Sequence, residues 1–158
     1  MTLPHADQQT DQQTDQRNDQ QNDQQTHQLM TLLYQNLLFL EAIKILKLKH
    51  PKDVLTILVS YIPVLGAGGT ELKTKPTQHA VRNLNSVGIQ PDIILGRASV
   101  PLDEKRKEKI QFTCGVAIED VISAPNVENI YEVAVNFEND NISERILEKL
   151  SLTARLTD

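Results

Sequence analysis

The clearest pattern along the chain is a change near residue 29, from a polar N-terminal stretch to alternating apolar and polar segments. Residues 7–26 repeat a four-residue unit five times, as DQQT-DQQT-DQRN-DQQN-DQQT, and residues 1–28 contain only three apolar side chains. So few apolar groups cannot offset the entropy that is lost when a chain becomes ordered. We therefore predict a disordered, low-complexity tail over 1–28 and a folded part over 29–158.

The first apolar segment after the tail has the spacing of a helix. Apolar residues in the stretch 29–49 form a broad face of a helix. Lysines gather near the C-terminal end of this helix, where the helix dipole favours cations. Pro51 cannot continue a helix, so the helix is expected to end just before it.

Beyond Pro51, short apolar runs alternate with amphipathic stretches. We expect a loop at 65–73 and strands at 54–64, 92–96 and 119–123. Helices are expected at 76–87, 101–113, 127–138 and 142–152. Alternation at this spacing is typical of a parallel sheet with crossover helices, so the predicted class is α/β. In such sheets ligands bind beyond the carboxyl ends of the strands.

Composition excludes several classes of function. The tail holds five Asp and one Arg, so most of the net charge of −5 belongs to it, and the folded part is nearly neutral with few aromatic residues. That composition is not typical of a nucleic-acid-binding protein. No apolar run is long enough to span a membrane, and no secretory signal is recognisable. Cys114 is the single cysteine, which is typical of a reducing compartment, and we expect a packed thiol in a cytoplasmic protein.

The residues with the most distinctive chemistry lie at Lys73–Gln78, which reads KTKPTQ. Two cations and two hydroxyls stand there at the expected N-terminus of a helix, where free N–H groups and the helix dipole attract anions. This is chemistry suited to a polyphosphate. From the residues alone, a solvated loop with a threonine cap is an equally good interpretation.

This segment resembles a known family. The stretch 71–93, ELKTKPTQHAVRNLNSVGIQPDI, closely resembles part of CTP synthase, the glutamine-hydrolysing enzyme. Similar landmarks occur at 39–43 (FLEAI), at 109–114 (KI with F and C), at 121–123 (VIS) and at 130–133 (IYEV). The resemblance runs from about 37 to 152. It implies a truncated N-terminal synthetase (amidoligase) domain with a partial three-layer parallel sheet of the P-loop type.

The resemblance also implies an activity and a site. The family aminates UTP to CTP in pyrimidine biosynthesis, using ATP, Mg²⁺ and glutamine-derived ammonia. The residues that match its UTP/CTP segment are Lys73, Thr74, Lys75, Pro76, Thr77 and Gln78, and Lys109 matches a further lysine of that nucleotide site. Lysines suit a triphosphate as point charges, and a glutamine can both donate and accept. Val127 alone survives from the family's adenine-side Lys-Asp-Val, so it is at most a weak ATP contact.

The chain departs from the family where ATP and metal should bind. No G-x-x-x-x-G-K-[ST] motif occurs, and the positions of the family's Asp-Ile-Glu segment hold Leu33-Tyr34-Gln35. We therefore expect no metal site, and neither a P-loop nor a glutaminase domain in this chain. The missing first strand should leave an unpaired edge or an exposed apolar face on the sheet, and the apolar helix at 29–49 is then a candidate surface for association.

Three functions stay open from the sequence, and no catalytic residue can be assigned. The chain is an incomplete CTP synthase with the family activity, or an inactive gene remnant. It could also be a non-catalytic module that binds UTP or CTP and associates with full-length subunits or with itself. Whether the chain alone is an enzyme is undecided at this point.

Overall fold

The computed structural model describes residues 36–65 and 71–154, and the chain divides into two compact units, Met1–Ala42 and Ile43–Asp158. The predicted tail over 1–28 lies outside the described residues. Residues 36–49 are helical, in agreement with the predicted helix over the part that is described. No helix in the described stretches combines the length and apolarity that a membrane crossing requires.

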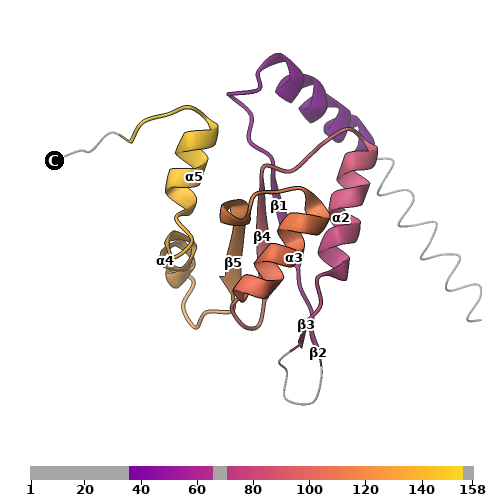
Figure 1. The fold of residues 1–158 in the computed structure, drawn as a ribbon. Helices are drawn as coiled ribbons and strands as arrows, with labels where there is room; N and C mark the ends of the chain where they lie inside the picture. Colours follow the sequence, from indigo (N-terminus) through magenta and orange to yellow (C-terminus); the bar gives the residue numbers. More distant parts are fainter. Residues whose placement is uncertain (1–35, 66–70, 155–158) are drawn as a thin grey trace, which may run out of the picture. The chain divides into compact units, whose positions relative to one another are not determined.

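The second unit is built on a three-stranded parallel sheet (Figure 1). Its strands are β1 (Ile57–Tyr61), β4 (Ile93–Ala98) and β5 (Val121–Pro125), in the spatial order β1-β4-β5. Ile57 pairs with Ile93, and Ile94 pairs with Val121. The predicted α/β class with parallel strands is therefore confirmed.

Two short strands lie where the sequence predicted the end of a long strand and a loop. β2 (Val64–Leu65) and β3 (Glu71–Leu72) pair antiparallel with each other. The Ile62 N–H still bonds to the Arg97 carbonyl of β4 at 2.7 Å. Pro63 has no N–H to continue the ladder, so the chain leaves the parallel sheet there. The predicted strand 54–64 is thus two strands.

Helices lie on both faces of the sheet, and the second face is covered beside β5 but not at β1. α2 (Lys75–Ser86) packs on β1 and on α3 (Glu104–Cys114), which also contacts β5. α4 (Glu132–Glu138) lies against β5, and α5 (Ile142–Lys149) lies against the 3₁₀ helix η1 (Ile118–Asp120). The predicted three-layer arrangement is confirmed in this part of the chain.

Local chemistry shifts two of the predicted boundaries. The expected strand at 119–123 starts only at Val121, because η1 occupies the residues before it. The expected helix at 127–138 starts only at Glu132. There the Asn129 side chain accepts a bond from the Tyr131 N–H at 3.1 Å, which is a turn rather than a helical start.

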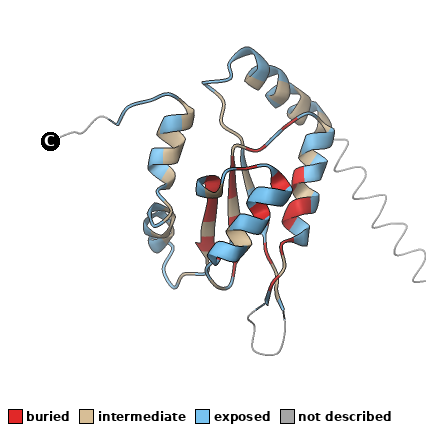
Figure 2. Ribbon diagram, in the orientation of Figure 1, coloured by how far each residue is buried: buried red, intermediate tan, exposed pale blue. Residues whose placement is uncertain are grey.

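The main core lies between the sheet and the helices α2 and α3, where Figure 2 shows the buried residues gathered. Gly96 of β4 stands at its closest contact, because a Cβ there would lie 2.5 Å from Leu102 Cδ1 and 2.9 Å from Ile62 Cδ1. Cys114 is buried in the same cluster, as predicted, and burial raises the pKa of its thiol. The remaining buried members include Val81, Ile94, Ile110, Val116 and Val121.

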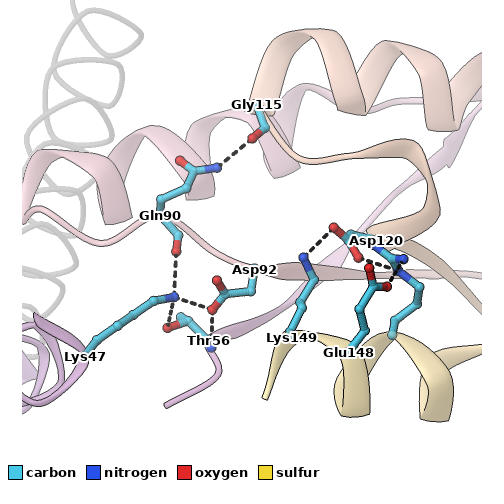
Figure 3. A network of polar contacts seen from close by, with 9 residues as sticks. Lys47, Thr56, Gln90, Asp92, Gly115, Asp120, Glu148 and Lys149 are labelled. Carbon is cyan, nitrogen blue, oxygen red and sulfur yellow. Dashed lines mark hydrogen bonds and ion pairs between the residues drawn. The ribbon is translucent and has the colours of Figure 1, made fainter. Parts of the chain in front are cut away.

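The helix at 36–49 does not pack through the apolar residues of its last two turns. Ile45, Leu46 and Leu48 are exposed, whereas Lys47 is half-buried. Its ammonium donates to Thr56 Oγ1 at 3.2 Å and forms an ion pair with Asp92, whose carboxylate also accepts the Thr56 N–H at 2.7 Å (Figure 3). The Asp92 carboxylate, which lies just before β4, is held at the start of β1 by the Thr56 N–H and needs a counter-charge. The helix therefore packs through Lys47, which supplies that charge.

Ion pairs to one buried carboxylate, that of Asp120, hold α5 against η1. Asp120 is 2% exposed, and it accepts Arg145 Nε at 2.9 Å and Lys149 Nζ at 2.6 Å (Figure 3). The two cations stand one helical turn apart, so both reach the same carboxylate. The hydrogen bond to Asp120 raises the pKa of Arg145 above its ordinary value.

We predict that Asp120→Ala lowers the free energy of unfolding by about 3 kcal/mol, because it leaves the half-buried Lys149 without its counter-charge and Arg145 with only the exposed Glu148. Urea denaturation followed by circular dichroism measures this. Glu119→Ala is the matched control, since Glu119 is the exposed neighbour of Asp120, and its effect should stay within about 0.5 kcal/mol. Equal losses in both variants would contradict the assigned role of Asp120.

Candidate functional site

A pocket of about 330 Å³ opens where α2 and α3 begin, beyond the carboxyl ends of β1 and β4. This is the edge of a parallel sheet at which ligands are expected, and the volume is in the range of small-molecule sites. Its lining comes from two separate segments of the chain: Glu71, Leu72, Lys73, Thr74 and Lys75 from the first, and Lys105, Arg106 and Lys109 from the second.

Backbone and side-chain bonds fix both segments. The Lys73 N–H bonds to the Pro63 carbonyl at 2.9 Å, which holds the approach to α2 beside the end of β1. The Leu102 N–H bonds to Ser123 Oγ at 2.9 Å, and the Asp103 carboxylate caps α3 by accepting the Arg106 N–H at 2.9 Å. The pocket is thus assembled on two anchored helix starts.

Positive charge dominates the lining, with five cations and the single carboxylate of Glu71. Lys73 is paired with Glu71 at 2.5 Å, and Arg106 is paired with Asp103 at 2.8 Å. Three lysines have no ion-pair partner among the described residues: Lys75, Lys105 and Lys109. Uncompensated cations around one concave surface attract an anion.

The positive charge of the lining lowers the pKa of Glu71. The hydrogen bond and charge of Lys73 hold the pKa of the Glu71 carboxyl below its ordinary value, and the charges of Arg106 and Lys109 lower it further. The contributions of Arg106 and Lys109 come from the second segment, so both segments act on the same carboxylate. Glu71 therefore stays ionised at neutral pH and competes with any bound anion for Lys73.

Behind the cations lies a buried network of hydroxyl and amide groups. Thr77 is fully buried, and its hydroxyl is bonded to Ser60 Oγ of β1 at 2.9 Å. Gln78 is buried too, and its Nε2 donates to Thr74 Oγ1 at 3.1 Å. Thr74 stands at the N-cap of α2 without capping the helix through its side chain. The threonine cap of the alternative interpretation is therefore not formed, because the Thr74 side chain is buried and bonded to Gln78 instead.

The structure brings together four of the residues singled out in the sequence, since Lys73, Thr74, Lys75 and Lys109 all line the pocket. Pro76 is exposed in the first turn of α2 and lies outside the lining, as do the buried Thr77 and Gln78. Val127 also lies outside it, in the segment between β5 and α4.

Sequence reasoning missed Glu71, Lys105 and Arg106, which also line the pocket. Lys105 and Arg106 belong to the charged run at 103–109, and such a run by itself indicates only a solvated helix face. The signal that was available is the spacing of Lys105 and Lys109, because residues four apart lie on the same side of a helix.

The pocket does not fit a protein-held Mg²⁺. That ion takes hard oxygen ligands such as carboxylates, and the pocket has only Glu71, which is already tied to Lys73. Across the described part of the chain, no group of three or more His, Cys, Asp or Glu side chains is placed to hold a metal.

A parallel α/β sheet with lysines that have no ion-pair partner among the described residues, placed beyond its carboxyl edge, is an arrangement suited to an anionic ligand. The sequence profile described as "CTP synthase N-terminus" matches residues 32–152, and the chain belongs to this family. It is 45% identical to a CTP synthase of Methanocaldococcus jannaschii and 42% identical to one of Chlamydia trachomatis serovar L2, each over 125 residues. Each alignment covers 78% of this chain and 23% of the relative, so the chain spans about a quarter of the length of these relatives.

We predict that Glu71→Gln strengthens binding of inorganic tripolyphosphate roughly two- to five-fold, because Lys73 loses its internal competitor. Isothermal titration calorimetry at pH 7 measures this. Glu108→Gln is the matched control, because it removes one exposed carboxylate of α3 outside the pocket lining. An equal gain in the control would show a general charge effect.

Proposed function

We propose that this chain binds UTP or CTP, with the triphosphate held by the lysines of the cationic pocket. The observation that carries the proposal is the meeting of Lys73 and Lys75 with Lys109, from two separate segments, at one concave site. The choice of a pyrimidine nucleotide rests on family membership, since the relatives named above are CTP synthases.

The division between exposed and buried residues supports separate roles within the site. Lys75 and Lys109 are exposed and unpaired among the described residues, so they contact the phosphates directly. Thr74, Thr77 and Gln78 are buried and bonded to one another or to β1, so they position the start of α2 rather than reach for the ligand. Gln78 then acts through Thr74.

We further propose that these 158 residues alone bind the pyrimidine nucleotide but do not convert UTP to CTP. Phosphoryl transfer depends on metal ions and on groups that position the triphosphate of ATP. The printed sequence has no P-loop motif, and no metal-binding group occurs in the described stretches. The ATP-dependent amination of UTP, which the resemblance implies, therefore requires groups from elsewhere. Full-length CTP synthase subunits are the proposed source.

The test is calorimetric titration of the full chain with UTP, CTP and UMP. We expect UTP and CTP to bind and UMP to bind far more weakly, because the lysines act on the phosphate chain. Lys75→Ala and Lys109→Ala should each weaken UTP binding about tenfold, the cost of one charge-assisted hydrogen bond. Lys52→Ala is the matched control, since Lys52 is exposed outside the pocket.

Three outcomes would contradict the proposal. A folded chain that binds neither UTP nor CTP would leave the inactive remnant as the better interpretation. Equal weakening by Lys52→Ala and Lys109→Ala would show that charge, rather than the pocket, attracts the nucleotide. CTP formation from UTP, ATP and ammonia by the chain alone would overturn the proposed absence of turnover.

A further inference from the structure

The two outer edges of the parallel sheet differ in how their backbone groups are used. β1 and β5 are the edge strands, with β4 between them. In a strand, the N–H and C=O of successive residues point alternately to either side. The residues whose groups face away from β4 can therefore be read from the bonds that do reach it.

At the β5 edge, every outward N–H is already bonded or missing. Asn126 directs its N–H to Ala98 of β4, so the outward positions of β5 are the odd-numbered ones. The Val121 N–H bonds to the Ile118 carbonyl, and the Ser123 N–H bonds to the Asp140 carboxylate at 2.6 Å. Pro125 has no N–H at all. This edge is closed to another strand.

The β1 edge has none of these protections in the part of the chain that the structure describes. Thr56 and Ile62 direct backbone groups to β4, so those of Ile57, Val59 and Tyr61 face outward. No described residue bonds to these outward groups. The strand reads ILVSY, without the lysine, proline or bulge that natural edge strands use against pairing.

The same three residues also present their side chains to solvent. Ile57 is 37% exposed, Val59 62% and Tyr61 66%, while Ser60 between them is buried under α2. Open backbone groups and exposed apolar side chains therefore coincide on β1, and the strand carries no charge.

We propose that β1 pairs antiparallel with β1 of a second copy of this chain, about a two-fold axis at Val59. Val59 then faces Val59 of the partner subunit, and Ile57 faces Tyr61 of the partner subunit. These outward residues form the hydrogen-bonded pairs of an antiparallel ladder, each exchanging two N–H···O bonds.

The strand is complementary to itself in this register. The two-fold places an aromatic side chain against a β-branched one on each side of a Val–Val pair, and such cross-strand pairs stabilise sheets. No like charges meet, because the strand is uncharged. Since the β5 edge is closed, each copy offers one edge only, and the association ends at a dimer instead of a fibre. This inference is independent of the proposed nucleotide binding.

The mass of the full chain in solution tests the proposal. Sedimentation equilibrium should show twice 17.8 kDa at high protein concentration and 17.8 kDa on dilution. Val59→Lys should raise the dimer dissociation constant at least about tenfold, because the two-fold brings the new charges face to face. Val135→Lys is the matched control, since Val135 is 67% exposed on α4, and it should leave the dimer intact.

Amide hydrogen exchange locates the interface without any substitution. In the dimer, the amides of Ile57, Val59 and Tyr61 should exchange slowly, and dilution should speed them. The Ile62 amide, which is bonded to β4, should not change with concentration. A chain that is monomeric at all concentrations overturns the proposal, as does a dimer that survives Val59→Lys or shows no concentration-dependent protection of these three amides.

Discussion

The absence of a side chain at Gly96 is the constraint on which this structure depends. A Cβ there would overlap Leu102 and crowd Ile62, so only glycine lets both residues close over the middle of β4. Ile62 directly follows β1, and Leu102 lies just before the N-cap of α3. Both side chains pack over Gly96, so this one position determines where the chain leaves β1 toward α2 and where it leaves β4 toward α3. Those connections carry the lysines of the cationic pocket.

The fold holds the cations of that pocket close together despite their mutual repulsion. Five cations surround one carboxylate, and three of them are unpaired among the described residues. The free-energy cost of this repulsion is offset by the apolar core beneath the pocket and by hydrogen bonds between uncharged hydroxyl and amide groups. The buried carboxylate of Asp120, by comparison, is paired with both Arg145 and Lys149. The contrast marks the pocket as the place that an anion would complete.

The sequence predicted most of the fold, because the alternation of apolar runs with amphipathic stretches is a local signal that a parallel α/β sheet makes strong. α2 and α3 lie close to their predicted bounds, since Pro76, Asp103 and Gly115 mark their ends. The β2–β3 pair was missed because two-residue strands have no periodicity. The basic residues of the first segment were found by motif. Lys105 and Arg106 were not, because the spacing of Lys105 and Lys109 shows that the two share a helix side but not that this side of α3 lines the pocket.

The bond between Ser60 and Thr77 has a consequence for how this sequence can vary. The two hydroxyls meet at 2.9 Å inside the protein, one on a strand and one on a helix. Replacing either one by an apolar residue would strand the other without a partner, whereas replacing both by apolar groups of similar shape can be nearly neutral. The two positions are therefore tied as a single unit of substitution, although 17 residues separate them along the chain.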